Sequence, residues 1–365
     1  MTDNDTIDLA VGTLASDSVR VVLEGQAASG AYVASPTFSQ YGFSWLRDGS
    51  FIALAMDAVG ERGSAARFHR WVCEAVWGVR DRVDEIVARI ATGRGVEPDR
   101  MLPTRYALDG TVEAAGDEAW PNFQLDGYGT WLFALEKHTA GRLDNHEAEV
   151  ADLAARYLEA TWSLPCFDYW EEFGDRRHTS TLAAVAAGLG AAGRMLRSDR
   201  YTAAAARVLR EIESTCVADG AFVKGPADRR VDASLLSLAT PFDLVPVDDA
   251  RMVATVDRVR AELVTPTGGV RRYVGDSYYG GSPWLLLTAW FGWHARRCGR
   301  PDEALAARRW VEARAGELGR LAEQDVSEPQ DPATVAEWER RWGPVADPLL
   351  WSHAMYLLLV AEDRA

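Results

Sequence analysis

Two adjacent glutamates, Glu171 and Glu172, follow a tryptophan, Trp170, in a stretch that is rich in aromatic side chains. Aromatic walls exclude water, and the loss of water raises the pKa of a carboxyl group. A carboxylic acid that stays protonated near neutral pH can give its proton to a leaving oxygen. Trp and Tyr faces also stack on the C–H face of a sugar ring. The stretch therefore indicates a general acid in a sugar pocket, although two acids ahead of a helix from about residue 177 would give the same local pattern.

A second stretch places Tyr41, Trp45, Arg47 and Asp48 where a long loop enters a helix. A sugar hydroxyl needs both a hydrogen-bond donor and an acceptor, which a neighbouring Arg and Asp supply, and Trp adds a stacking face. Asp48 can also be the N-cap of a helix that begins near Ser50, a role that does not exclude contact with a ligand. We expect these four side chains to bind a sugar.

Two further stretches carry polar and aromatic residues in loops. Residues 269–284 hold Arg272, Tyr273 and several other aromatic residues between glycines, which favours a polar ligand over a glycine-rich turn with packed aromatics. Further along, Glu323 is followed by Gln324. A carboxylate can take a proton from water while a neighbouring amide orients that water. Without its context, this pair would be no more than solvated polar residues.

The last candidate stretch begins the final helix, where Trp351 and His353 lie close to the loops. A lone His in such a place is more often structural, so we assign no catalytic role to His353 or to His178. Two carboxylates on different loops of one pocket, with aromatic walls and no metal, suit glycoside hydrolysis. No serine nucleophile elbow, phosphate-binding loop or complete dinucleotide-binding glycine motif competes with this interpretation.

The elements that must position these residues are helices, because apolar residues recur with a helical period almost throughout, for example over 50–59, 64–91 and 301–318. Short polar turns alternate with long connections that are rich in Gly, Pro and aromatic residues. These long connections are 30–47, 93–126, 164–178, 219–231, 265–283 and 322–347. The alternation predicts an all-α (α/α)6 barrel, in which six helical hairpins close into a ring and the long loops form a pocket on one face. We expect a single catalytic domain over residues 1–365; the alternative is an open solenoid, but no fixed-period repeat is visible.

The composition excludes several classes of partner. The chain has 365 residues, a formal net charge of −15 and an isoelectric point near 4.9, which argues against nucleic acid. No apolar run reaches membrane-spanning length, so we expect no membrane partner. The four cysteines form no CxxC pair and the six histidines no HxxH or HxxxH pair, so we expect no metal and no cofactor. The first residues lack a basic and an apolar signal region, and we expect a cytoplasmic protein.

Five motifs together resemble glycoside hydrolase family 15, the glucoamylase-like exo-glucosidases. They are a Y-x-x-x-W-x-R-D segment from Tyr41, a W-E-E acid loop from Trp170, an R-Y-x-x-D-x-Y-Y-x-G-x-P-W loop from Arg272, an E-Q pair at Glu323 and a W-S-x-A helix start at Trp351. Each motif is modest, but the ordered set spans nearly the whole chain. The fold of that family is the (α/α)6 barrel, in agreement with the alternation of turns and loops.

The resemblance implies a role for each matching residue. Glu171 would be the general acid, and Glu323 the general base that activates water. Glu172 would hold the leaving sugar, while Gln324 and Tyr41 would position the water. The implied substrate-binding residues are Tyr41, Trp45, Arg47, Asp48, Trp120, Trp170, Glu172, Arg272, Tyr273, Gln324 and Trp351.

The resemblance further implies an inverting exo-acting hydrolase that releases β-D-glucose from the non-reducing end of short α-gluco-oligosaccharides. The chain resembles the short bacterial isomaltose glucohydrolases within the family, which favours a small oligosaccharide with an α-1,6 linkage. Two departures are a Leu-Ala-Glu-Gln base motif, where Pro often precedes the Glu, and an insertion at about 327–343 that is expected to reshape the pocket rim. The alternatives are an α-1,4-specific glucoamylase, a non-catalytic sugar-binding domain and a disaccharide phosphorylase of the same fold.

Overall fold

The computed structural model describes residues 14–112 and 123–362, and the regular structure in these ranges is almost entirely helical. The α-helices are α1 (Leu14–Glu24), α2 (Leu46–Ala58), α3 (Arg62–Gly78), α4 (Arg80–Ala91), α5 (Asp126–Thr139), α6 (Asn145–Thr161), α7 (Thr179–Met195), α8 (Asp199–Thr215), α9 (Ala250–Glu262), α10 (Leu285–Arg297), α11 (Pro301–Glu312), α12 (Pro332–Trp342) and α13 (Leu350–Glu362). The short 3-10 helices are η1 (Ser39–Tyr41), η2 (Pro98–Arg100), η3 (Ala233–Leu238), η4 (Tyr278–Gly281) and η5 (Glu317–Gly319).

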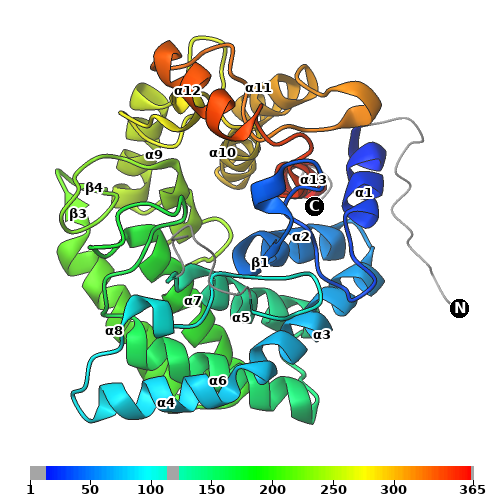
Figure 1. The fold of residues 1–365 in the computed structure, drawn as a ribbon. Coiled ribbons are helices and arrows are strands. Elements are labelled where there is room, and N and C mark those ends of the chain that lie inside the picture. Colours follow the sequence, from blue (N-terminus) through cyan, green and yellow to red (C-terminus); the bar gives the residue numbers. More distant parts are fainter. Residues whose placement is uncertain (1–13, 113–122, 363–365) are drawn as a thin grey trace, which may run out of the picture.

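Six helices form a closed inner ring in the order α2, α5, α7, η3, α10 and α13, and α13 packs back against α2. Outside them lie α3, α6, α8, α9, α11 and α1, each packed against a neighbour in the inner ring (Figure 1). This is the (α/α)6 barrel that the sequence predicts. The short helix η3 takes the place of one full inner α-helix.

The sequence of each helix decides its layer. In α13 the residues 350–360 are all buried, whereas the buried residues of α8 form one stripe of Tyr201, Ala204, Val208 and Ile212. A helix that is apolar on every side belongs inside the ring, and a helix with one apolar stripe covers it from outside. Most of the buried apolar side chains of the described residues form one contiguous core. Within the same ranges, no helix has both the length and the apolar character needed to cross a bilayer.

Two inner helices, α5 and α7, pack closely because each presents a glycine to the other. A Cβ on Gly129 would lie 2.3 Å from the backbone oxygen of Ala184, and a Cβ on Gly188 would lie 2.6 Å from the Cα of Gly129. Neither position has room for a side chain. The connections at the ends of α5 and α7 are thereby held close together.

Two small antiparallel sheets connect the loops. β1 (Ser44–Trp45) pairs with β2 (Arg105–Tyr106), and β3 (Val217–Ala218) pairs with β4 (Ala221–Phe222). The first pairing joins two long connections that are far apart in the sequence, at the place where the pocket forms.

The start of α2 differs from the sequence prediction. The helix begins at Leu46 instead of near Ser50, because the preceding strand β1 ends directly against it and Trp45 takes the N-cap position. Asp48 therefore lies inside the first turn and is not the N-cap, so that prediction is wrong.

Two other predicted helices are shorter than expected. The helix expected over 64–91 is interrupted at Val79, whose φ of −109° and ψ of 16° are not helical, so that α3 and α4 are separate. Gly78, just before the break, weakens the helix there. The helix expected over 301–318 ends at Glu312, ahead of a turn in which Leu318 is left-handed with a φ of 57°.

Candidate active site

A pocket of about 440 Å³ opens where the long connections meet. Four of the six long connections form its wall, together with the first turns of α2 and α13. The lining residues are Ala34, Tyr41, Trp45, Arg47, Asp48, Tyr169, Trp170, Glu171, Glu172, Arg272, Tyr278, Trp284, Glu323, Trp338, Arg341, Trp342, Leu349 and Trp351. Acidic and basic side chains thus lie among aromatic faces, a mixture that suits a ligand with both hydroxyl groups and C–H faces.

Glu171 lies in the connection between α6 and α7 and lines the pocket. Trp45 Nε1 donates a hydrogen bond to Glu171 Oε1 at 2.6 Å. Burial raises the pKa of Glu171 to about 7, although Arg47 and the bond from Trp45 oppose this shift. The backbone of Glu171 is left-handed, with a φ of 62°, a conformation that costs a non-glycine residue about 1–2 kcal/mol. The surrounding structure must therefore hold this turn firmly.

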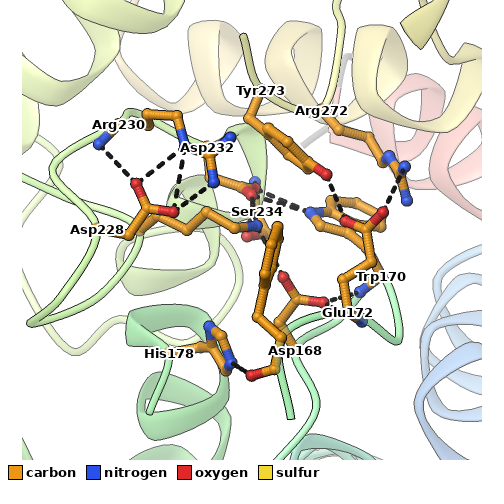
Figure 2. Close-up of polar contacts among 12 residues, drawn as sticks. Asp168, Trp170, Glu172, His178, Asp228, Arg230, Asp232, Ser234, Arg272 and Tyr273 are labelled. Carbon is orange, nitrogen blue, oxygen red and sulfur yellow. Dashed lines mark hydrogen bonds and ion pairs between the residues drawn. The ribbon is translucent and has the colours of Figure 1, made fainter. Parts of the chain in front are cut away.

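Asp168 closes the turn that carries the acid. Its Oδ1 accepts hydrogen bonds from the backbone N–H groups of Trp170 and Glu172, both at 2.9 Å. Its Oδ2 pairs with the buried ammonium of Lys224 at 2.8 Å. Lys224 also pairs with Asp232. Asp232 accepts a hydrogen bond from Trp170 Nε1 at 3.0 Å (Figure 2). One buried cation thus joins the acid turn to the connection between α8 and α9.

Glu323 lies in the connection between α11 and α12 and is 2% exposed. The hydroxyl of Tyr41 donates a hydrogen bond to Glu323 Oε1 at 3.0 Å and lies 2.8 Å from the hydroxyl of Tyr278. Burial raises the pKa of Glu323 to about 8, against the opposing effects of the Tyr41 bond and of Arg272. Glu323 Oε2 is buried and has no hydrogen-bond partner. An ionised Glu323 can therefore present this oxygen to a proton of a bound molecule.

The two carboxyl groups are held by two neighbouring aromatic side chains. The rings of Tyr41 and Trp45 meet edge to face, with centroids 5.7 Å apart. Tyr41 donates to Glu323 and Trp45 donates to Glu171. Because each carboxyl group has its own partner, the two can hold different protonation states. One group can then donate a proton while the other accepts one.

Arg47 and Asp48 lie in the first turn of α2 and form an ion pair at 3.2 Å. Arg47 Nη1 also contacts Asp126 Oδ2 at 3.2 Å and donates to Gln124 Oε1 at 3.1 Å. Gln124 and Asp126 are absent from the pocket wall. They hold the arginine that lines it.

Glu172 is joined to the connection between α9 and α10. Tyr273 donates its hydroxyl proton to Glu172 Oε2, and Arg272 Nη2 donates to Oε1 at 3.4 Å (Figure 2). Arg272 in turn pairs with the buried carboxylate of Asp276. Burial raises the pKa of Glu172. The side chain of Glu172 is thus fixed by two neighbours and still lines the pocket.

Several lining residues carry buried polar atoms without a hydrogen-bond partner in the described protein. These atoms are Glu323 Oε2, Arg47 Nε, Trp284 Nε1 and Trp351 Nε1. An unsatisfied buried polar group costs about 1–3 kcal/mol, so such groups call for a partner. Because the set contains both donors and acceptors, a ligand with several hydroxyl groups matches it.

Most of the residues that the sequence singled out meet at this pocket. Tyr273 and Gln324 are buried but absent from the pocket wall. Tyr273 supports Glu172, and Gln324 forms a β-bridge with Trp284 through its backbone. Trp120 lies outside the described residues.

Sequence reasoning missed Lys224 and Asp232, and it assigned no role to Tyr278 or Arg341. A signal for Lys224 was present, because it is one of only two lysines in a chain whose other basic residues are arginines. Arginine would not fit as a compact charge between two buried carboxylates.

One group outside the pocket could offer metal ligands. Ligand atoms of Asp57, His69 and His138 lie within 4.8 Å of one another. Asp57 already pairs with His138 Nδ1 at 2.9 Å, and the rings of the two histidines lie 4.8 Å apart, centroid to centroid. Burial lowers the pKa of His69 to about 3, so this imidazole stays neutral. None of the three lines the pocket, and the group contributes nothing to its chemistry.

Two other histidines hold the backbone near the pocket. His353 Nε2 accepts a hydrogen bond from the Leu321 N–H at 3.0 Å, and its Nδ1 contacts Ser18 Oγ at 2.9 Å. His178 Nε2 contacts the Phe173 carbonyl oxygen at 3.0 Å. Both rings therefore brace the loops that carry the two glutamates.

Comparisons with known proteins place the chain in a family. The family model of Glycosyl hydrolases family 15 matches residues 17–339. An isomaltose glucohydrolase from Kribbella flavida is 42% identical over 359 residues, which cover 96% of this chain and 92% of the relative. A glycosidase variant solved in complex with glucose is 41% identical, with a TM-score of 0.91 over 96% of this chain and 95% of that chain. A bacterial glucoamylase complexed with acarbose has the same fold at 21% identity, with a TM-score of 0.72 over 95% of this chain and 55% of that chain.

The family match extends over most of the chain, and the relatives above 40% identity match it almost end to end. The family model covers both carboxyl groups of the pocket and most of its lining residues, and Arg341, Trp342, Leu349 and Trp351 lie beyond its last matched residue. The chain therefore belongs to glycosyl hydrolase family 15 and is a glycoside hydrolase with the (α/α)6 fold.

Proposed function

We propose that this chain is an inverting exo-acting α-glucosidase that releases β-D-glucose from the non-reducing end of short α-gluco-oligosaccharides, with isomaltose-type α-1,6 linkages favoured. The observation that carries the proposal is the pair Glu171 and Glu323. These are two carboxyl groups in one aromatic pocket, each with a raised pKa and its own hydrogen-bond donor. The 42% identity to an isomaltose glucohydrolase supports the linkage.

In the proposed reaction, protonated Glu171 gives its proton to the glycosidic oxygen as the bond to the anomeric carbon breaks. Ionised Glu323 takes a proton from the water that attacks the anomeric carbon from the opposite face, so an α-linked substrate yields β-glucose. Tyr41, which is bonded to Glu323, is placed to orient this water. The leaving sugar thus receives the proton of Glu171. The water supplies a hydroxyl group to glucose and a proton to Glu323, so that the atoms balance.

We assign the terminal glucose to the inner end of the pocket. Arg47 and Asp48 are each 6% exposed there, and the Arg47 guanidinium lies over the ring of Trp351, 5.1 Å from its centroid. Together they offer donors, acceptors and a stacking face to one sugar ring. The pocket, at about 440 Å³, lies at the small end of ligand sites, which supports a substrate of few sugar rings.

The proposal includes the organisation of the chain. We expect residues 1–365 to act as one catalytic domain without a cofactor. The four cysteines are all free thiols, which fits a reducing, cytoplasmic compartment.

A comparison of substrates tests the linkage. The second candidate is an α-1,4-specific glucoamylase, because the same contacts could grip the terminal glucose of either linkage. Isomaltose, maltose and trehalose are each incubated with the enzyme, with and without phosphate, and the product anomer is followed by NMR. We expect β-glucose from isomaltose at the highest rate and no effect of phosphate. Faster cleavage of maltose would favour the second candidate, and α-glucose as first product would contradict inversion.

Removing either carboxyl group should stop the reaction at a different step. Glu171→Gln and Glu323→Gln should each lower kcat on isomaltose by about 10²–10⁴, the usual contribution of a proton-transfer group. With 4-nitrophenyl α-glucoside, whose leaving group needs no proton, Glu171→Gln should recover most of its rate and Glu323→Gln should not. Initial rates measure both effects, and thermal unfolding controls for folding. A wild-type rate in Glu323→Gln would show that the base is assigned wrongly.

The pH dependence follows from the two pKa values, about 7 for Glu171 and about 8 for Glu323. Below about pH 7 both groups are protonated and no base is present; above about pH 8 both are ionised and no acid is present. A profile of kcat/KM should therefore peak between pH 7 and 8.

Two matched variants test which glutamate sets the acidic side and which sets the alkaline side of that pH profile. Tyr41→Phe removes a bond that lowers the pKa of Glu323, so the alkaline limb should move to higher pH. Trp45→Phe removes a bond that lowers the pKa of Glu171, so the acidic limb should move to higher pH. A Tyr41→Phe profile with an unmoved alkaline limb would mean that Glu323 does not set it.

Lys224 should act as a positioning residue for the acid. Lys224→Met leaves Asp168 and Asp232 without their cation, so the acid turn loosens and kcat on isomaltose should fall at least about tenfold. The fall should be smaller with 4-nitrophenyl α-glucoside, because that substrate depends less on the acid. An equal decrease in kcat on both substrates would show that Lys224 only stabilises the fold and does not position the acid.

A milder variant guards against loss of the fold, since breaking a buried ion pair can cost about 3–5 kcal/mol. Ser234→Ala removes one hydrogen bond to Asp232 and keeps the ion pair. Ser234→Ala should also lower kcat more on isomaltose than on 4-nitrophenyl α-glucoside, but both decreases should be smaller than in Lys224→Met.

A further inference from the structure

The helix α12 contributes to the pocket without belonging to the barrel. None of its residues is fully buried, and Figure 1 shows it as an orange-red helix outside the inner ring. Its Trp338, Arg341 and Trp342 nevertheless line the pocket. An exposed helix of 11 residues that sends three side chains into a binding pocket requires an explanation beyond stability.

Contacts with η4 and its flanks hold α12 in place. Trp338 Nε1 donates to the Ser277 carbonyl oxygen at 3.0 Å. The ring of Trp338 meets that of Tyr278 with centroids 5.0 Å apart and that of Trp342 with centroids 5.3 Å apart. The backbone N–H group of Asp331, at the start of α12, donates to the Gly280 carbonyl oxygen at 3.0 Å. The helix is therefore fixed at the pocket by its own pocket-lining face.

The burial of the lining residues distinguishes a deep end of the pocket from an open end. Arg47, Asp48 and Trp351 are nearly inaccessible, at 6%, 6% and 3% exposure. Trp338 is half-buried and Arg341 is exposed. The deep end thus lies at the first turns of α2 and α13, and α12 lies at the open end.

The side chains of α12 have the chemistry of a sugar site. The guanidinium of Arg341 lies 5.4 Å from the ring centroid of Trp338 and 4.9 Å from that of Trp342. Held this way, it offers several N–H donors next to two aromatic faces. Hydroxyl groups accept from such donors, and the C–H face of a sugar ring packs on the indoles.

We propose that α12 forms the binding site for the leaving sugar and closes the pocket behind it, so that Trp338 and Arg341 set the chain length of the substrate. The inference rests on the proposed function, because it assumes that the terminal glucose occupies the deep end. The second sugar of a disaccharide then meets α12. A third sugar would have to pass this helix. Each sugar unit added to the substrate therefore lowers its fit to the pocket.

The test compares substrates of increasing length. The values of kcat/KM are measured for isomaltose, isomaltotriose and isomaltotetraose with the full chain, with Trp338→Ala, with Arg341→Ala and with both changes together. The double variant should lose activity on isomaltose, and its ratio of isomaltotriose to isomaltose activity should rise at least about fivefold. Arg340→Ala is the matched control, because Arg340 lies on the same helix, bonds the Ala336 carbonyl oxygen and does not line the pocket.

The outcomes separate the two proposals. A ratio that matches the wild type and Arg340→Ala would overturn the role of α12 while the hydrolysis itself stands. No hydrolysis of any of the three sugars by the wild type would instead overturn the proposed α-1,6 specificity. If the double variant unfolds at a lower temperature, Arg341→Ala carries the test, because its side chain is exposed and its removal leaves the aromatic contacts in place.

Discussion

The chemistry of this pocket depends on two carboxyl groups that are kept partly dry while each is bonded to its own aromatic donor. Burial raises the pKa of both Glu171 and Glu323 towards neutrality, and without it neither would exchange protons near pH 7. Burial alone would leave both groups protonated. The indole of Trp45 and the phenol of Tyr41 oppose that shift, because each donates a hydrogen bond that favours the ionised form. The balance between exclusion of water and directed hydrogen bonds therefore makes one acid and one base available together.

The loop that presents Glu171 is held by buried ion pairs. Lys224 lies between Asp168 and Asp232, and the remaining negative charge of this group is met by donors that include Ser234. A buried charge without its partner is costly, so conformations of the loops that would separate these groups are strongly disfavoured. This rigidity accounts for a left-handed backbone at Glu171 in a connection without regular structure.

The sequence could predict the features that local chemistry determines. Glu171 and Glu323 stand in aromatic or polar loop stretches, and the alternation of short turns with long loops indicates the barrel. Contacts between distant loops could not be predicted, so the pairing of Lys224 with Asp168 was missed. The sequence allows an N-cap at Asp48 because inner helices lack an amphipathic period that marks their start. The pairing of β1 with β2, which local sequence does not encode, decides where α2 begins.

The closing helix and the proposed base are physically coupled. A helix of 11 residues with no buried residue is not stable in isolation, so α12 depends on its contacts with Tyr278 and its neighbours. Tyr278 also contacts the hydroxyl of Tyr41, which donates to Glu323. A ligand that pushes α12 away therefore disturbs the ring that supports the donor to Glu323. The length of the substrate and the protonation state of Glu323 are therefore linked through the side chains of Tyr278 and Tyr41. This link requires no change in the barrel.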